Sequence, residues 1–209
     1  MNYRVLTVSR EFGSGGGRIA DSIARRLNWK LLDAALIDEI ACAAHVDAGV
    51  VSRFDEHIDG WLQRMNRQAM RGAALAAGVA LEQEKCFDED EMTDLTQHII
   101  LRAYEAGNCV IVGRGAQCIL QTKADVFHVF VYAPMRVRIR KLRERLESRT
   151  DIEQRIRDVD TGRAHYLKLR FGKEWNNPHL YDLMISAGED EEQTARVIEF
   201  AMGKADCTI

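Results

Sequence analysis

The chain has 209 residues, which is enough for one ordinary domain with a buried core or for a core with a small inserted subdomain. Hydrophobic residues make up 46% of it and charged residues 29%, a balance that excludes an extensively disordered chain. The formal net charge of -3 gives no general attraction to nucleic acid or anionic lipid. Clustered arginines could still bind a small anionic ligand.

The opening residues lack a long apolar region, and no segment approaches the roughly 18 uncharged apolar residues that span a bilayer. The five cysteines are irregularly spaced without a C-x-x-C pair, and the six histidines do not fall at metal-ligand intervals. We therefore expect a cytoplasmic protein with free thiols and no protein-bound metal, and neither nucleic acid nor a membrane as a partner.

The opening 32 residues predict a strand, a loop, a helix and a second strand. The run from Tyr3 to Val8 is apolar and β-branched, and it leads into a glycine-rich loop over 9–17. Apolar residues then recur at the helical spacing of i, i+4 and i+8 from Ile19 to Leu27. A short extended segment over 30–32 predicts the second strand.

The pattern over about 34–107 is almost wholly helical. It predicts one alanine-rich helix over about 59–85, an interruption at the acidic residues 88–91, and a further helix over 92–106. The apolar stripe of the first helix favours core packing, and a homodimer through this helical segment is the alternative.

The second half alternates strands with helices. Strands are predicted at 109–112, 126–132 and 183–186, and helices at 135–149, from a Thr150–Glu153 capping box onward, and from Asp190 to about Met202. Such alternation favours an α/β fold with a mostly parallel sheet covered by helices on both faces.

The glycine-rich loop is placed to bind phosphate. Its glycines let successive backbone N–H groups turn toward one point, and the following helix adds unpaired donors and the positive end of its dipole. The candidate nucleotide-binding residues are Ser9, Arg10, Gly13, Ser14, Gly15, Gly16 and Gly17. A connector without a ligand is one alternative. A dinucleotide-binding turn is another, because Gly15-x-Gly17-x-x-Ala20 matches G-x-G-x-x-A.

The loop departs from the P-loop pattern G-x-x-x-x-G-K-[ST] at the positions that carry its chemistry. Gly15 is the second glycine, but Gly16 stands where the lysine is expected and Gly17 where the magnesium-binding hydroxyl is expected. Arg10 stands at the first glycine. We expect another cation to replace the lysine. Arg18 is slightly favoured because helical side chains point toward the helix N-terminus, and Arg10 is the alternative.

Arginines are concentrated after the central strands. Arg114 directly follows a buried strand, which puts it at the carboxyl end of the sheet, where ligands bind in open α/β folds. The densest run is Arg136, Arg138, Arg140, Arg143, Arg145, Arg149, Arg155, Arg157 and Arg163. The planar guanidinium matches phosphate oxygens in pairs, so this run predicts a lid over a polyphosphate, with Arg138, Arg140 and Arg157 as nucleotide-binding candidates.

Four motifs, in order and spacing, resemble the cytidylate kinase-like family of P-loop nucleoside monophosphate kinase relatives. They are Leu6-Thr-Val-Ser-Arg-Glu-Phe-Gly-Ser-Gly-Gly, Val110-Ile-Val-Gly-Arg-Gly, Asp160-x-x-Arg163 followed by Tyr166, and Tyr181-Asp-Leu-Met-Ile-Ser. They are spread along the chain from Leu6 to Ser186, so the resemblance extends over nearly the whole chain.

The resemblance implies a P-loop NTPase-like three-layer fold with a five-stranded, mostly parallel sheet in a single domain over 1–209. It further implies a helical insert at about 34–107 and an arginine-rich lid at about 135–170. The implied activity is transfer of the γ-phosphoryl group of ATP, with Mg²⁺, to CMP, dCMP or a similar small acceptor. Carried over by position, Gly13, Ser14 and Gly15 hold the ATP phosphates.

The same resemblance suggests the catalytic set. Arg114 would bind the phosphate of the acceptor, Asp160 and Arg163 would belong to the lid, and Arg18 would be the replacement cation. Classical members have Asp-Gly-Arg-Asp where this chain has Val112-Gly113-Arg114-Gly115, so two acidic groups are absent. The leading hypothesis is a nucleotide-dependent phosphotransferase, and the alternative is a non-catalytic nucleotide-binding or regulatory protein with the same fold.

Overall fold

The computed structural model describes residues 2–37, 89–145 and 151–204, with the side chains of 89–92 excepted. The chain divides into two compact units, of which one comprises Met1–Ala34 and Gln97–Ile209 and the other Ala35–Thr96. The smaller unit falls within the segment predicted as a helical insert. The predicted helix over 59–85, with its proposed dimer face, lies outside the described residues.

The larger unit is built on a five-stranded sheet with the order β2-β3-β1-β4-β5, in which all neighbours are parallel. The strands are β1 (Val5–Arg10), β2 (Lys30–Leu32), β3 (Cys109–Val112), β4 (Val126–Tyr132) and β5 (Leu183–Ser186). The central strand β1 pairs Val8 with Val112 on one side and Val129 on the other. Its residues Val5 to Ser9 are all buried, as expected for a strand covered on both faces.

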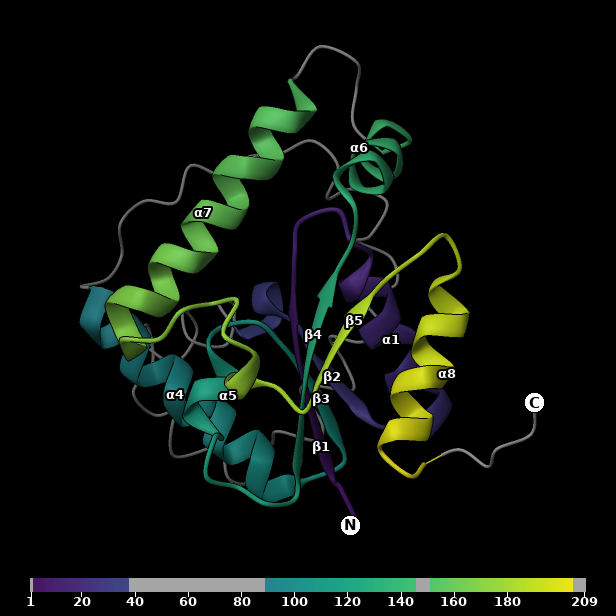
Figure 1. Ribbon diagram of the computed structural model, residues 1–209. Coiled ribbons are helices and arrows are strands. Elements are labelled where there is room, and N and C mark those ends of the chain that lie inside the picture. Colours follow the sequence, from purple (N-terminus) through teal and green to yellow (C-terminus); the bar gives the residue numbers. More distant parts are fainter. Residues whose placement is uncertain (1, 38–88, 146–150, 205–209) are drawn as a thin grey trace. The chain divides into compact units, whose positions relative to one another are not determined.

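Helices cover both faces of this sheet, which confirms the three-layer α/β expectation. Helix α1 (Gly16–Leu27) and helix α8 (Glu191–Ala201) pack together on one face, and the short α5 (Ala116–Ile119) lies on the other (Figure 1). The core joins Ile19 and Ile23 of α1 to Leu6 and Val129 of the sheet. The helical spacing of apolar residues in α1 thus marks the face that the sheet buries.

Two helices follow β4 in the predicted lid region. Helix α6 (Met135–Arg143) ends six residues before the predicted end of the basic helix, and its last residues turn at Glu144. Helix α7 (Ile152–Phe171) is capped by Asp151, whose carboxylate accepts a hydrogen bond from the Gln154 N–H at 3.2 Å. The predicted Thr150–Glu153 capping box is therefore wrong, because Asp151 caps the helix and Glu153 pairs with Arg157 instead.

Other element boundaries also differ from the prediction. Strand β1 continues to Arg10, so Ser9 and Arg10 belong to the strand rather than to the loop. Helix α4 (Glu89–Ala106) includes Glu89, Asp90 and Glu91, which were expected to interrupt it, whereas Asp88 lies outside the described residues. The sequence patterns missed α5 and the 3-10 turn η1 (Pro178–Leu180). The predicted N-cap of α8 is confirmed, because Asp190 accepts a hydrogen bond from Gln193 N–H at 2.9 Å.

Candidate functional site

The glycine loop lies between the end of β1 and the start of α1. Gly13 and Gly15 adopt left-handed φ angles of 82° and 91°, which other residues rarely do. The Ser14 hydroxyl donates to the Glu11 carbonyl at 2.9 Å and accepts from Gly16 N–H at 3.3 Å, so it closes the loop from within. The N–H groups of Gly13, Gly15 and Gly17 donate no hydrogen bond to any residue that the structure describes. These donors fit an anion such as phosphate.

Arg138 and Asp160 hold this loop in place. The Asp160 carboxylate accepts a hydrogen bond from Phe12 N–H at 2.8 Å, and the Arg138 guanidinium donates to the Phe12 carbonyl, also at 2.8 Å. Arg138 is 5% exposed and forms ion pairs with Glu11 and Asp160. Arg138, predicted to bind the nucleotide, and Asp160, predicted as a catalytic residue of the lid, are thus engaged with the backbone of the loop.

A second group of charges surrounds the outer side of the loop. Arg18 and Lys141 both form ion pairs with Glu191, and the Lys141 ammonium also donates to the carbonyls of Gly188 at 2.9 Å and Ser14 at 3.4 Å. Burial would raise the pKa of Glu191, but hydrogen bonds from the two cations outweigh burial and lower it. Sequence reasoning missed Lys141, a buried lysine on an otherwise arginine-rich helix.

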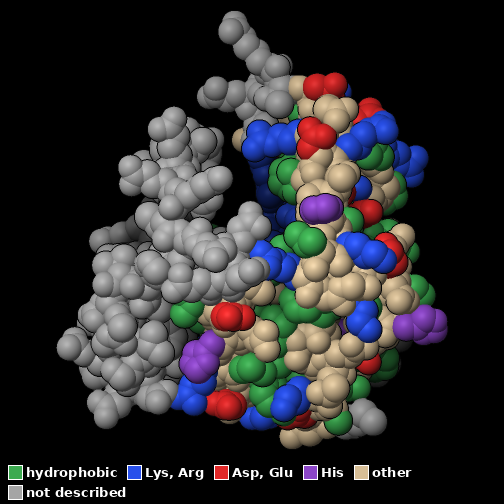
Figure 2. Space-filling view, turned by 90° about the vertical axis from the view of Figure 1, so that its left-hand side faces the viewer, with side chains coloured by type: hydrophobic (Ala, Val, Ile, Leu, Met, Phe, Trp, Pro, Cys, Tyr) green, Lys and Arg blue, Asp and Glu red, His purple; other side chains and the backbone are tan. Residues whose placement is uncertain are grey.

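The other lid candidates lie at the surface in ion pairs. Arg140 pairs with Glu189, and Arg157 pairs with Glu153 one helical turn away. All four side chains are about half exposed or more. Basic and acidic side chains are interspersed over much of the described surface in Figure 2, as such pairs require. We read these arginines as solvated surface residues in this structure.

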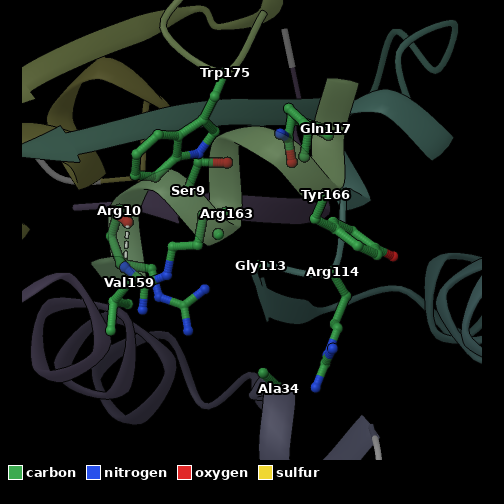
Figure 3. A pocket seen from close by; sticks show the side chains of 13 residues that line it. Ser9, Arg10, Ala34, Gly113, Arg114, Gln117, Val159, Arg163, Tyr166 and Trp175 are labelled. Atoms are coloured by element: carbon green, nitrogen blue, oxygen red, sulfur yellow. Dashed lines mark hydrogen bonds between the residues drawn. The ribbon is translucent and has the colours of Figure 1, made fainter. Parts of the chain in front are cut away.

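A cavity of about 350 Å³ opens beside the loop, at the carboxyl ends of β1 and β3. Three arginines from separate elements line it: Arg10 at the end of β1, Arg114 in the turn after β3, and Arg163 on α7 (Figure 3). The turn at Arg114 has left-handed φ angles at three successive residues, which directs the chain from β3 into α5. No Asp or Glu is among the described residues that line this cavity.

The electrostatics of the cavity favour an anion. Burial, with additional repulsion from Arg163, lowers the pKa of Arg10 to about 10 despite the attraction of Asp33. Burial likewise lowers the pKa of Arg163, whose guanidinium donates to the Arg10 carbonyl at 2.8 Å and lies 5.8 Å from the centre of the Phe12 ring. A bound anion would relieve the cost of holding these cations together in a partly buried site.

The inner wall of the cavity carries a polar side chain that sequence reasoning missed. Gln117 is 1% exposed, and its Nε2 has no hydrogen-bond partner among the described residues. Figure 3 shows its amide turned toward Ser9. Tyr166 and Trp175 contribute aromatic surface, and Trp175 is held by a hydrogen bond from the Tyr181 hydroxyl to its carbonyl at 2.7 Å.

The described residues fit phosphates better than they fit a metal ion. Among them, no three His, Cys, Asp or Glu side chains come together as metal ligands. Gly17 supplies no hydroxyl at the position where a P-loop binds magnesium. Cys109 and Cys118 are free thiols, and burial raises their pKa values to about 12 and about 11. The site can therefore position anions, but its described part offers no ligand set for Mg²⁺.

A parallel β2-β3-β1-β4-β5 sheet, a glycine loop between β1 and α1, and arginines at the carboxyl edge together define a P-loop kinase-like fold. The chain belongs to the cytidylate kinase-like family, whose sequence profile matches residues 5–189. No curated protein matches it closely enough to be counted as a relative.

Solved structures with this fold include an uncharacterized protein from Eubacterium ventriosum, with 18% identity and a TM-score of 0.69 over 96% of this chain and 99% of that one. A shikimate kinase from Bacteroides thetaiotaomicron has 17% identity and a TM-score of 0.53, covering 95% of this chain and 98% of its own. A gluconokinase from Sinorhizobium meliloti has 10% identity and the same TM-score, covering 98% and 94%. At these identities the likeness establishes the fold alone. In the described part of the chain, no helix is long and apolar enough to cross a membrane.

Proposed function

We propose that this protein is a nucleotide-dependent phosphotransferase that moves the γ-phosphoryl group of ATP to a nucleoside monophosphate, with CMP or dCMP as the first candidates. The observation that carries the proposal is the cavity beside the glycine loop, which Arg114 and Arg163 line from different elements and whose described lining contains no Asp or Glu. Membership in the cytidylate kinase-like family supports the choice of acceptor.

In this proposal the loop holds the donor and the cavity holds the acceptor. The N–H groups of Gly13, Gly15 and Gly17, which donate to no described residue, bind phosphate oxygens of ATP, which supplies the phosphoryl group when bound. Arg138 and Asp160 position the loop through the backbone of Phe12. Phosphoryl transfer requires little covalent chemistry from the protein, so this positioning and charge neutralisation are its main contributions.

Arg114 and Arg163 bind the phosphate of the acceptor. A guanidinium offers paired donors to phosphate oxygens, and two guanidiniums from separate elements fix the orientation of a dianion. Tyr166 and Trp175 offer flat apolar surface to the remainder of the acceptor, which suits a nucleobase or another planar group. The partner of this site is thus a small phosphorylated molecule.

The test is release of ADP from ATP and Mg²⁺ in the presence of single acceptors: CMP, dCMP, UMP, AMP, shikimate and gluconate. The last two are included because the fold is shared with a shikimate kinase and a gluconokinase. We expect turnover with a pyrimidine monophosphate, and Arg114→Ala or Arg163→Ala should raise KM for that acceptor by about tenfold or more. Arg157→Ala, on the exposed surface of α7, is the matched control and should leave KM unchanged. Equal KM values in all three variants would contradict the assignment of the cavity.

One observation favours a second function, a nucleotide-binding regulatory protein. Gly16 and Gly17 replace the lysine and hydroxyl that P-loop enzymes use, and the described residues offer no ligand set for a metal. The same series of acceptors, with ATP binding measured beside ADP release, separates the two functions. ATP binding without ADP release across the complete acceptor series would favour the regulatory function.

A further inference from the structure

Two positions that face each other across the loop carry the reverse of the expected P-loop residues. The pattern G-x-x-x-x-G-K puts glycine at position 10 and lysine at position 16. This chain has Arg10 and Gly16. A Cβ atom built on Gly16 would lie 2.6 Å from Cβ of Arg10 and 3.2 Å from its Cγ. The two positions are therefore in direct contact, although they are six positions apart in the sequence.

This contact makes side chains at the two positions mutually exclusive. Atoms of this kind do not approach within 3.0 Å, and a Cβ cannot swing away because it is fixed to the backbone. Val131 closes the same space, with its Cβ 3.4 Å from the added atom. Gly17 next door is unrestricted, because no atom lies within 4 Å of a Cβ built there. Gly16 is required by the presence of Arg10, whereas Gly17 is not sterically required.

Arg10 carries its charge into the space between the loop and β3. Its guanidinium lies against Gly113, where an added Cβ would overlap it, and it lines the cavity together with Arg163. The charge of Asp33 attracts the Arg10 guanidinium, whereas the neighbouring charges of Arg163 and Arg114 repel it. Figure 3 shows the head groups of Arg10 and Arg163 side by side, with Arg114 entering from the other side.

We propose that the glycine and the cation of the P-loop have exchanged places, so that Gly16 makes room for Arg10 and Arg10 neutralises the phosphates of the donor nucleotide. This inference rests on the proposed function and names the cation that the function needs. Arg18 is less suited to the role, because it is 50% exposed and paired with Glu191. With a pKa of about 10, Arg10 remains charged at neutral pH.

The experiment restores the usual pattern in two steps. The variants are Arg10→Gly, Gly16→Lys and the double variant Arg10→Gly/Gly16→Lys, with Gly17→Ala as the steric control and Arg18→Ala as the charge control. Arg10→Met keeps the strand and most of the side-chain volume but removes the charge, in case Arg10→Gly folds poorly. Each variant is measured for melting temperature, for calorimetric binding of inorganic triphosphate, and for ADP release.

We expect Gly16→Lys alone to lower the melting temperature, and the double variant to recover it, because only the double variant removes the Cβ contact. Gly17→Ala should lower it far less than Gly16→Lys does. Arg10→Met and Arg10→Gly should lose triphosphate binding and about 10³- to 10⁵-fold in turnover, which is the effect of losing a cation at the transferred phosphoryl group. The double variant should regain both, and Arg18→Ala should retain both.

Full triphosphate binding and turnover in Arg10→Met would overturn the proposal. A Gly16→Lys protein with an unchanged melting temperature and unchanged binding would also overturn it. Failure of the proposed function is a different result: the natural protein would bind triphosphate through Arg10 but release no ADP with any acceptor. In that case the exchange stands and the protein is a binding protein.

Discussion

The carboxylate of Asp160 accepts a hydrogen bond from the backbone N–H of Phe12 at 2.8 Å, although the two residues are 148 positions apart. This contact joins α7 to the glycine loop and also places Asp160 beside the buried guanidinium of Arg138. The shape of the loop therefore depends on a helix that follows it late in the sequence.

Asp160→Asn should destabilise the protein and weaken phosphate binding together. Removing one partner leaves the Arg138 charge buried without full compensation, which costs roughly 3–5 kcal/mol for a buried pair. Urea unfolding measures the loss of stability, and calorimetry with triphosphate measures binding. Asp158→Asn is the control, because Asp158 is exposed on the same helix and accepts from Gln154. Equal stability of the two variants would show that the contacts of Asp160 do not stabilise the protein.

Replacing Gln117 should affect acceptor binding without lowering the stability of the fold. Its buried Nε2 lacks a partner among the described residues, so Gln117→Leu should leave the melting temperature unchanged or raise it. The same change should weaken acceptor binding by about tenfold, the loss expected for one hydrogen bond to a ligand. Gln121→Leu, at an exposed position after α5, is the control for added apolar surface. A lower melting temperature with unchanged acceptor KM would assign Gln117 to the core instead.

His128 should make stability depend on pH. Its ring is 7% exposed, Nδ1 lies 2.7 Å from the Thr7 hydroxyl, and burial lowers its pKa despite the opposing charge of Asp182. Because the folded protein holds His128 neutral, its contribution is complete above the unfolded pKa of about 6.5 and is lost as pH falls through the lowered pKa. Urea unfolding at pH 7.5, 6.5 and 5.5 should show this decline. His128→Gln should show a shallower decline, and an identical one would contradict the argument.

Local patterns predicted the sheet because each strand is a short buried run between turn residues. The predictions at 109–112, 126–132 and 183–186 match the observed strands residue for residue. The predicted cap of α7 was wrong because Asp151 stands next to Thr150, and both residue types cap helices well. Sequence alone does not decide between adjacent caps.

Residues of the site could be predicted only where they belong to a recognisable sequence motif. Arg114 and Arg163 follow from a strand end and a family motif, and the structure brings them to one cavity. Gln117, Lys141 and Trp175 carry no local signal, because their roles arise from contacts with distant residues. The contact between Arg10 and Gly16 is of the same kind: the pattern showed two departures, and only the structure relates them.

Both the proposed function and the assignment of Arg10 require that the glycine loop binds phosphate. The most direct measurement is an NMR titration of the ¹⁵N-labelled protein with ATP, followed at the backbone amides of the glycines. We expect the largest shifts at Gly13, Gly15, Gly16 and Gly17, with Gly172 and Gly203, at the ends of α7 and α8, unchanged. Shifts confined to residues outside the loop, with these four amides unmoved at saturating ATP, would contradict it.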